Sequence, residues 1–258
     1  MDDRSVESVS SVGDDWLHMG EWKYSLFFDP LSDVGAHPVV KEIEQYIEHR
    51  QLDEHQFFRL ANHSKSALVL WATQELVMTN AFSQLVLRAA SCIPNVHARA
   101  VLVEIASGEH GSSRRGIAKH AHPWLLSQLG SSIDLDLVQV SPAEPTIMFI
   151  RRLATHIDTL LNMLAYIGVG NERLIIPEYT AVKKCFAEQW PESMYKLFLD
   201  ANLNEDISHS QLCYLLASMV IKSEKDAESF KSAAIASIDS RFEYFDGLQA
   251  LVESEIGD

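Results

Sequence analysis

The chain has 258 residues, of which 47% are hydrophobic, and a formal net charge of −15 at pH 7. This length and composition allow one large domain with a full core, or two smaller ones. The acidic balance, without any run rich in Lys or Arg, argues against binding to nucleic acid or to an anionic membrane surface.

The N-terminus shows no basic region followed by an apolar stretch, so no signal peptide is predicted. Apolar runs stay well short of the ~18 residues that a transmembrane helix needs. Three scattered cysteines, Cys92, Cys185 and Cys213, form neither a CxxC pair nor a disulfide framework. Together these features predict a protein of the reducing cytoplasm.

Helical patterns dominate the chain from residue 36 onward. Residues 1–35 are predicted to form an N-terminal segment, disordered at its Ser- and Asp-rich start, with an aromatic stretch that docks on the body. Residues 36–258 are predicted to form a single all-α domain, a bundle of about eight helices with short connections. Helices are expected over 37–50, 65–91, 96–111, 116–130, 141–168, 177–190, 191–222 and 224–255.

Turn signals set the expected boundaries. Pro94 ends the second helix, and Gly111 and Gly130 stop the third and fourth. The alternating stretch "IDLDLVQV" has no partner strand and is interpreted as a linker. The glycine cluster "GVGNE" lacks the flanking strand that a dinucleotide or phosphate loop requires, which excludes nucleotide binding at that point.

Several carboxylates and imidazoles stand in apolar helices. Asp206 and His209 are three residues apart and therefore share a helix face, with Asn202 one turn earlier on that face. Taken alone, each such residue has an ordinary explanation as a solvated or capping side chain. The further candidates are Glu75, Glu104, Glu109, His120, His122 and Glu172.

The combination points to a metal centre inside the bundle. Helical bundles that gather carboxylates and histidines in their core are typical cages for two irons or manganeses. No Glu-x-x-His motif occurs, which disfavours the ferritin type.

Three stretches carry a resemblance to a known family. They are "LVEIASGEHGSSRRGIAKHAHPWLLSQLG", "LAYIGVGNERLIIPEY" and "YKLFLDANLNEDISHSQL". The chain resembles the haem-oxygenase-like diiron oxidases and oxygenases, the iron-containing redox enzyme group, over roughly residues 36–250. Their fold is shared with thiaminase II and the pyrroloquinoline-quinone synthase, so the resemblance implies a haem-oxygenase-like bundle.

The resemblance also implies a set of ligands for two Fe(II) ions: Glu75, Glu109, His120, Glu172, Asp206 and His209. His122 is close enough in sequence to replace His120, and Glu104 competes with Glu109 for the same role. Where the family has its first late-helix histidine, this chain has Asn202. An amide oxygen is a weaker iron ligand than imidazole, so the second iron is expected to bind weakly, to bind only with substrate present, or not to bind.

The implied activity is oxidation of a small amino-acid-like or fatty-acid-like substrate by dioxygen. N-oxygenation, desaturation and oxidative C–C cleavage, often in specialised metabolism, all remain open. Trp71, Phe82, Trp124 and Met163 are candidates for the apolar substrate pocket, or for plain core.

Two rival hypotheses remain. One is a metal-free, thiaminase-like enzyme of the same fold, and the other is a catalytically inactive binding protein. Neither nucleic acid nor a membrane is an expected partner, and a homodimer is compatible with the fold.

Overall fold

The structure is a computed structural model that describes residues 36–93, 95–110, 121–137 and 140–256. Side chains at 97, 204–208 and 255–256 lie outside the described set. Within the described residues the secondary structure is helical, without a β-strand, which confirms the predicted all-α class. The predictions for residues 1–35 lie outside the described residues.

The α-helices, in chain order, are α1 (Pro38–Arg50), α2 (Gln56–Ala61), α3 (Lys65–Cys92), α4 (Val96–His110), α5 (His122–Ser132), α6 (Glu144–Thr155), α7 (Leu160–Met163), α8 (Leu174–Gln189), α9 (Tyr195–Val220) and α10 (Glu224–Ile256). A 3₁₀ turn, η3 (Leu52–Glu54), precedes α2, and a π-helix, η5 (Leu164–Arg173), joins α7 to α8.

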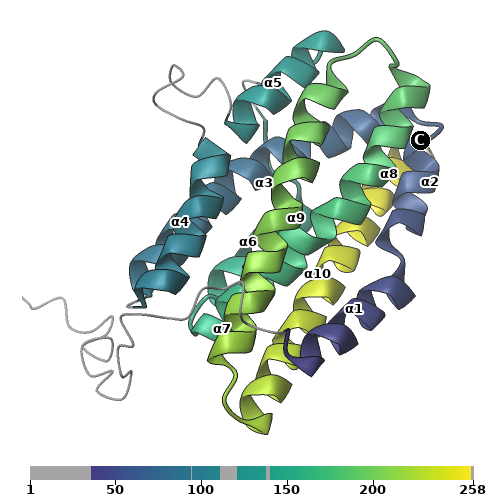
Figure 1. Cartoon of the computed structure of the whole chain (residues 1–258). Coiled ribbons are helices and arrows are strands. Elements are labelled where there is room, and N and C mark those ends of the chain that lie inside the picture. Colours follow the sequence, from purple (N-terminus) through teal and green to yellow (C-terminus); the bar gives the residue numbers. More distant parts are fainter. Residues whose placement is uncertain (1–35, 94, 111–120, 138–139, 257–258) are drawn as a thin grey trace, which may run out of the picture.

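Three long helices organise the bundle. Helices α3, α9 and α10 have 28, 26 and 33 residues, and α3 crosses behind α9 (Figure 1). The π-helix η5 packs against both α9 and α10, and α3 packs against α4, α5, α6 and α10. Helix α1 lies along α10 at one side of the molecule, and α5 lies near one end of α9 (Figure 1). Chain segments far apart in sequence therefore meet around η5 and α3.

The first helix shows how the apolar pattern positions an element. Its inward face carries Val40, Ile43 and Ile47, as predicted, together with Val39. His37 is the N-cap, and its Nδ1 accepts a hydrogen bond from the Val39 amide. Pro38 follows in the first turn, where its missing N–H costs nothing.

The fourth predicted helix needs correction at both ends. Ala121 is an extended N-cap, and α5 begins only at His122, because Pro123 suits a first turn and would remove a hydrogen bond inside a helix. Residues 116–120 lie outside the described set. Gly130 does not stop α5, which continues to Ser132. A Cβ on Gly130 would stand 2.7 Å from Leu137, so this glycine admits a close chain approach.

The fifth predicted helix, over 141–168, is broken. Helix α6 ends at Thr155, and Thr159 then caps α7 by accepting a hydrogen bond from the Asn162 amide. From Leu160 the helix continues without interruption to Gln189, through η5 and α8. Pro177, expected to open a new helix, lies instead inside this continuous helix, four residues after the π-helical segment ends. The short α2 was not predicted.

Two glycines allow η5 to lie unusually close to its neighbours. A Cβ on Gly168 would stand 2.3 Å from the Cβ of Cys213 on α9. A Cβ on Gly170 would stand 1.6 Å from the Oγ of Ser237 on α10. Consequently η5 is held between two long helices, with every residue from Leu164 to Glu172 buried. No helix in the described part of the chain is long and apolar enough to cross a membrane.

Gly170→Ala is expected to destabilise the protein by about 1–3 kcal/mol, the usual cost of inserting a methyl group into a packed core. Urea denaturation measures the loss. Removing the opposing side chain with Ser237→Gly should reduce the cost of Gly170→Ala in a double-mutant cycle. Equal costs in both backgrounds would show that this contact does not limit the approach of η5 to α10.

Candidate metal centre

A small cavity of about 10 Å³ lies in the bundle core, enclosed by α3, α4, α5, η5, α8 and α9. The polar residues that line it are Glu75, Thr79, Glu109, His122, Asn171, Tyr179 and Asn202. The apolar lining consists of Met78, Phe82 and Ile175. Six segments of the chain therefore converge on one point, and most of the polar groups come from different helices.

Glu109 and His122 form a buried pair at this cavity. Glu109 lies near the end of α4 and is 6% exposed, and His122 opens α5 and is 2% exposed. The His122 Nδ1 and Glu109 Oε1 atoms are 3.1 Å apart. His120, the first choice from sequence, lies outside the described residues, whereas its alternative His122 contacts Glu109. Glu104 is exposed and contributes nothing to the cavity lining.

Glu172 and His209 form a second buried pair, in which the His209 Nδ1 lies 3.2 Å from the Glu172 Oε2. Glu172 is fully buried on η5, and His209 on α9 is 6% exposed. In the wide turn of a π-helix, Asn171 and Glu172 are both directed inward although they are consecutive. Such π-helical segments are rare and often occur at functional sites.

Asn202 on α9 stands beside the first buried pair and on the same helix face as the histidine of the second. It is 2% exposed, lines the cavity beside Glu109 and His122, and its Nδ2 donates to the Phe198 carbonyl oxygen at 2.7 Å. His209 stands seven residues further on, two helical turns away on the same face. Position 206 falls between them in this register, but the side chain of Asp206 lies outside the described residues.

Glu75 on α3 also lines the cavity. It is 3% exposed, and the Tyr179 hydroxyl donates to its Oε1 at 2.6 Å. Burial raises the pKa of the Glu75 carboxyl from its usual 4.5 to about 7, and the negative charges of Glu178 and Glu109 act in the same direction. The positive charge of Arg241 and the Tyr179 hydrogen bond oppose this rise. Glu75 is therefore partly protonated near neutral pH in the metal-free protein.

Each of the three buried carboxylates keeps one oxygen without a hydrogen-bond donor: Glu75 Oε2, Glu109 Oε2 and Glu172 Oε1. A buried carboxylate oxygen without a partner is costly, which implies that something else satisfies it. Among the described residues, however, no three His, Cys, Asp or Glu side chains stand close enough together to hold a metal ion. The described candidates occur as two pairs and a single glutamate.

Behind the cavity lies a charged network that sequence reasoning missed. Arg241 on α10 is 1% exposed and donates through Nε to Glu178 Oε2 at 2.8 Å, and its Nη2 also contacts that oxygen. Its Nη1 donates to Asn171 Oδ1 at 3.3 Å. The Trp71 indole donates to the other oxygen of Glu178 at 3.1 Å. Arg241 therefore holds Glu178 and Asn171, which are the sequence neighbours of Tyr179 and Glu172.

A pattern in the sequence does signal this buried arginine. Arg241 shares a helix face with Ile238 and Phe245, three residues before it and four after it, and both are fully buried. An arginine on such an apolar face must find a buried anion.

The two buried cysteines offer no reactive thiolate. Burial raises the pKa of the Cys185 thiol to about 11, and its Sγ contacts the Phe58 carbonyl oxygen. Burial also raises the pKa of Cys213, and the negative charge of Glu172 adds to this effect. Both thiols are therefore protonated at neutral pH and are poor nucleophiles.

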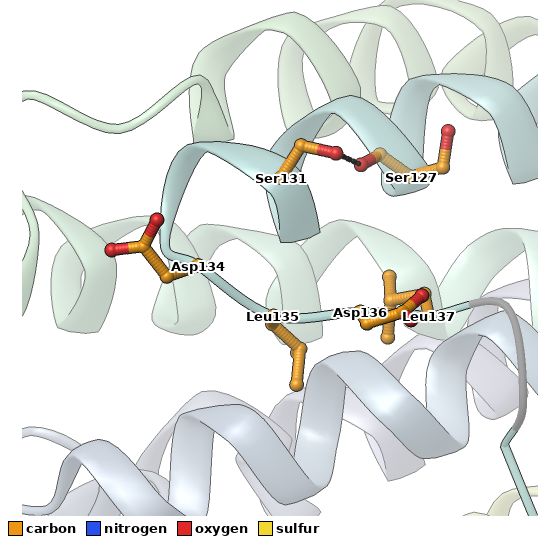
Figure 2. A pocket seen from close by; sticks show the side chains of 6 residues that line it. All are labelled: Ser127, Ser131, Asp134, Leu135, Asp136 and Leu137. Carbon is orange, nitrogen blue, oxygen red and sulfur yellow. Dashed lines mark hydrogen bonds between the residues drawn. The ribbon is translucent and has the colours of Figure 1, made fainter.

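A larger, open pocket of about 620 Å³ lies beside the end of α5 (Figure 2), and the residues that line it include none of the candidate ligands. Ser127, Ser131, Leu135 and the two aspartates Asp134 and Asp136 line it. The aspartates lie apart along the pocket in Figure 2 and form no carboxylate pair. We therefore assign the candidate centre to the small buried cavity.

Comparison with known proteins identifies the family. The iron-containing redox enzyme family matches residues 69–241, which is most of the chain and includes both buried pairs. The chain belongs to this family, as the resemblance of its motifs indicated. No curated protein matches the chain.

Solved structures share the fold at low sequence identity. A CADD-like protein of unknown function from Nostoc punctiforme is 19% identical, with a TM-score of 0.66, over 82% of this chain and 96% of that one. A domain of unknown function with a heme oxygenase-like fold from Shewanella denitrificans is 16% identical, with a TM-score of 0.65, over 83% and 93%. A TenA homolog from Pseudomonas syringae is 13% identical, with a TM-score of 0.65, over 86% and 98%. The protein thus has the haem-oxygenase-like fold.

The raised pKa of Glu75 predicts how the stability of the metal-free protein depends on pH. Because the folded protein holds this proton up to about pH 7 and the unfolded chain releases it near 4.5, stability should fall as the pH rises between these values. The loss attributable to Glu75 is at most about 3 kcal/mol. Urea denaturation of wild type and Glu75→Gln across this range isolates it, with the exposed Glu104→Gln as control. Parallel stability curves for wild type and Glu75→Gln would contradict the raised pKa.

Proposed function

We propose that the protein is a non-haem, iron-dependent oxidoreductase that uses dioxygen to oxidise a small substrate in the bundle core. The observation that carries the proposal is the set of three buried carboxylates, each with one oxygen that lacks a donor, two of them beside buried histidines. Family membership supports iron as the metal.

The donor set fits iron chemically. Carboxylate oxygen and imidazole nitrogen are ligands that suit ferrous ions, and carboxylates neutralise their charge. One iron would be held by Glu109 and a histidine of the α5 segment, His122 or His120, with Glu75 lining the same cavity. The other would be held by Glu172, His209 and Asp206. When bound, the irons would supply the electrons and the binding site needed to activate dioxygen.

The chain's own residues position and shield this chemistry. Tyr179 fixes the orientation of Glu75 through the hydrogen bond to Oε1, leaving Oε2 for the centre. Each histidine contacts one oxygen of its carboxylate partner, so the two pairs are already formed in the metal-free protein. Phe82, Met78 and Ile175 supply the apolar part of the cavity lining and exclude water from it. The reaction remains among N-oxygenation, desaturation and oxidative C–C cleavage of an amino-acid-like or fatty-acid-like molecule.

A metal-free reaction by a cysteine nucleophile is disfavoured, because both buried thiols have raised pKa values. An inactive binding protein is the alternative that Asn202 favours, since a neutral amide lines the cavity beside Glu109 and His122.

Anaerobic titration with ferrous ion tests the proposal. Wild type should bind iron, and His209→Ala and Glu109→Gln should each lose one site or weaken it by about 10–100-fold. The exposed His156→Ala serves as the matched control and should bind as wild type does. Iron-loaded wild type should consume dioxygen when a substrate is present, and His209→Ala should not. Absence of iron binding in wild type would support the metal-free alternatives.

Asn202→His gives a gain-of-function test of the same site. A histidine at this position places a nitrogen donor on the α9 face that also carries position 206 and His209, and it should tighten the weaker ferrous ion by about 10–100-fold. Asn202→Ala is the control for loss of the Phe198 hydrogen bond alone. Identical titration curves for wild type and Asn202→His would mean that this position does not face a metal.

A further inference from the structure

A line of aromatic rings leads from the cavity towards the surface. Tyr179 lines the cavity, and Trp71 packs edge-on against it with ring centroids 5.8 Å apart. Phe186 follows at 6.0 Å from Trp71, and Trp190 lies 5.9 Å beyond Phe186. Trp71, Tyr179 and Phe186 are completely buried, whereas Trp190, at the end of α8, is half-buried. The line therefore begins at the candidate centre and ends at solvent.

The two inner redox-active rings each have a proton acceptor in place. The Tyr179 hydroxyl donates to Glu75 Oε1 at 2.6 Å, and the Trp71 indole N–H donates to Glu178 Oε1 at 3.1 Å. Tyrosine and tryptophan lose an electron far more readily when their proton can leave at the same time. Apolar core packing alone does not require both polar hydrogens to point at carboxylates.

We propose that Tyr179, Trp71 and Trp190 form a relay that carries oxidising equivalents from the cavity to the surface when no substrate consumes them. This inference rests on the proposed function, in which dioxygen at the iron centre supplies the oxidant. The relay would protect the ligands and the apolar lining from oxidation during such unproductive turnover. A cellular thiol is the class of reductant that would restore it.

The steps balance one electron at a time. Tyr179 gives an electron to the oxidised centre and its phenolic proton to Glu75. Trp71 then reduces the Tyr179 radical, which regains its proton from Glu75, while the Trp71 indole proton passes to Glu178. Trp190 then reduces Trp71 across the Phe186 ring, Trp71 regains its proton from Glu178, and Trp190 loses its own N–H proton to water. A thiol donates a hydrogen atom to the Trp190 radical, and the resulting thiyl radicals combine as disulfide.

The residues around the outer rings determine where the relay reaches solvent and in which direction oxidising equivalents move. The Lys65 ammonium lies 4.9 Å from the centre of the Trp190 ring, which disfavours a cationic indole and promotes loss of its proton to water. Tyr195 also stacks on Phe186 but is only 4% exposed, so the exit lies at Trp190. Aromatic rings yield electrons only to strong oxidants. The relay therefore removes oxidising equivalents and does not deliver electrons to a resting centre.

Transfer along the relay is testable without iron. Flash photolysis of ruthenium tris-bipyridine with a sacrificial electron acceptor oxidises accessible tryptophan, and electron paramagnetic resonance detects a tyrosyl radical. In the iron-free full chain the radical should form at Tyr179, and its yield should fall several-fold in both Tyr179→Phe and Trp71→Phe. Trp71→Tyr keeps an oxidisable ring and should retain the yield.

Two variants at half-buried tryptophans test the relay without changing a fully buried side chain. Trp190→Phe removes the entry point at the rim and should lower the radical yield, whereas Trp124→Phe, at a half-buried tryptophan on α5 outside the line of rings, should not. Equal yields in wild type, Tyr179→Phe and Trp190→Phe would overturn the relay. Failure of the proposed function shows separately, as absence of iron binding in the ferrous titration, because the photochemical test needs no metal.

Discussion

Burial of carboxylate charge is the constraint on which the rest of this structure depends. Glu75, Glu109, Glu172 and Glu178 all lie inside an apolar bundle at 6% exposure or less. A carboxylate in such a place must be protonated, paired with a cation, or bound to a metal. Only Glu178 has a full cationic partner, in Arg241. Each of the other three carboxylates keeps one oxygen without a hydrogen-bond donor, and a pair of ferrous ions would satisfy these oxygens.

The backbone directs those carboxylates into the bundle core. The π-helix η5 directs Asn171 and Glu172 into the core, and Gly168 and Gly170 let it approach α9 and α10 more closely than any side chain would permit. Arg241, from near the C-terminus, then supports the ligand walls through Asn171 and Glu178. Segments far apart in the sequence thereby form one small cavity, which is consistent with a metal site that is already formed in the metal-free protein.

Much of the fold was predictable because helix periodicity and capping act locally. The long helices α3 and α10 and the apolar face of α1 follow directly from such patterns. The break after Thr155 did not, although Thr159 caps the helix that follows it. The continuity of η5 with α8 did not either, because η5 is held by tertiary packing against α9 and α10.

The candidate site was predictable in part. Residues in motifs, such as Glu109 and His209, were found from their spacing and resemblance, and the structure places each beside a partner of the opposite type. Tyr179 and Glu178 were missed, because each matters only through contacts between helices far apart in sequence, whereas Arg241 was missed although its apolar helix face signals burial. His120 and the side chain of Asp206 lie outside the described residues and stay predictions.

The most direct test of the central claim is a crystal structure of protein loaded with ferrous ion without oxygen, with anomalous scattering recorded at the iron edge. The account predicts anomalous peaks inside the bundle, one within bonding distance of Glu109 and a histidine of the α5 segment, the other bound by Glu172 and His209. Iron found only at the surface, with the two buried pairs still closed on themselves, would contradict it.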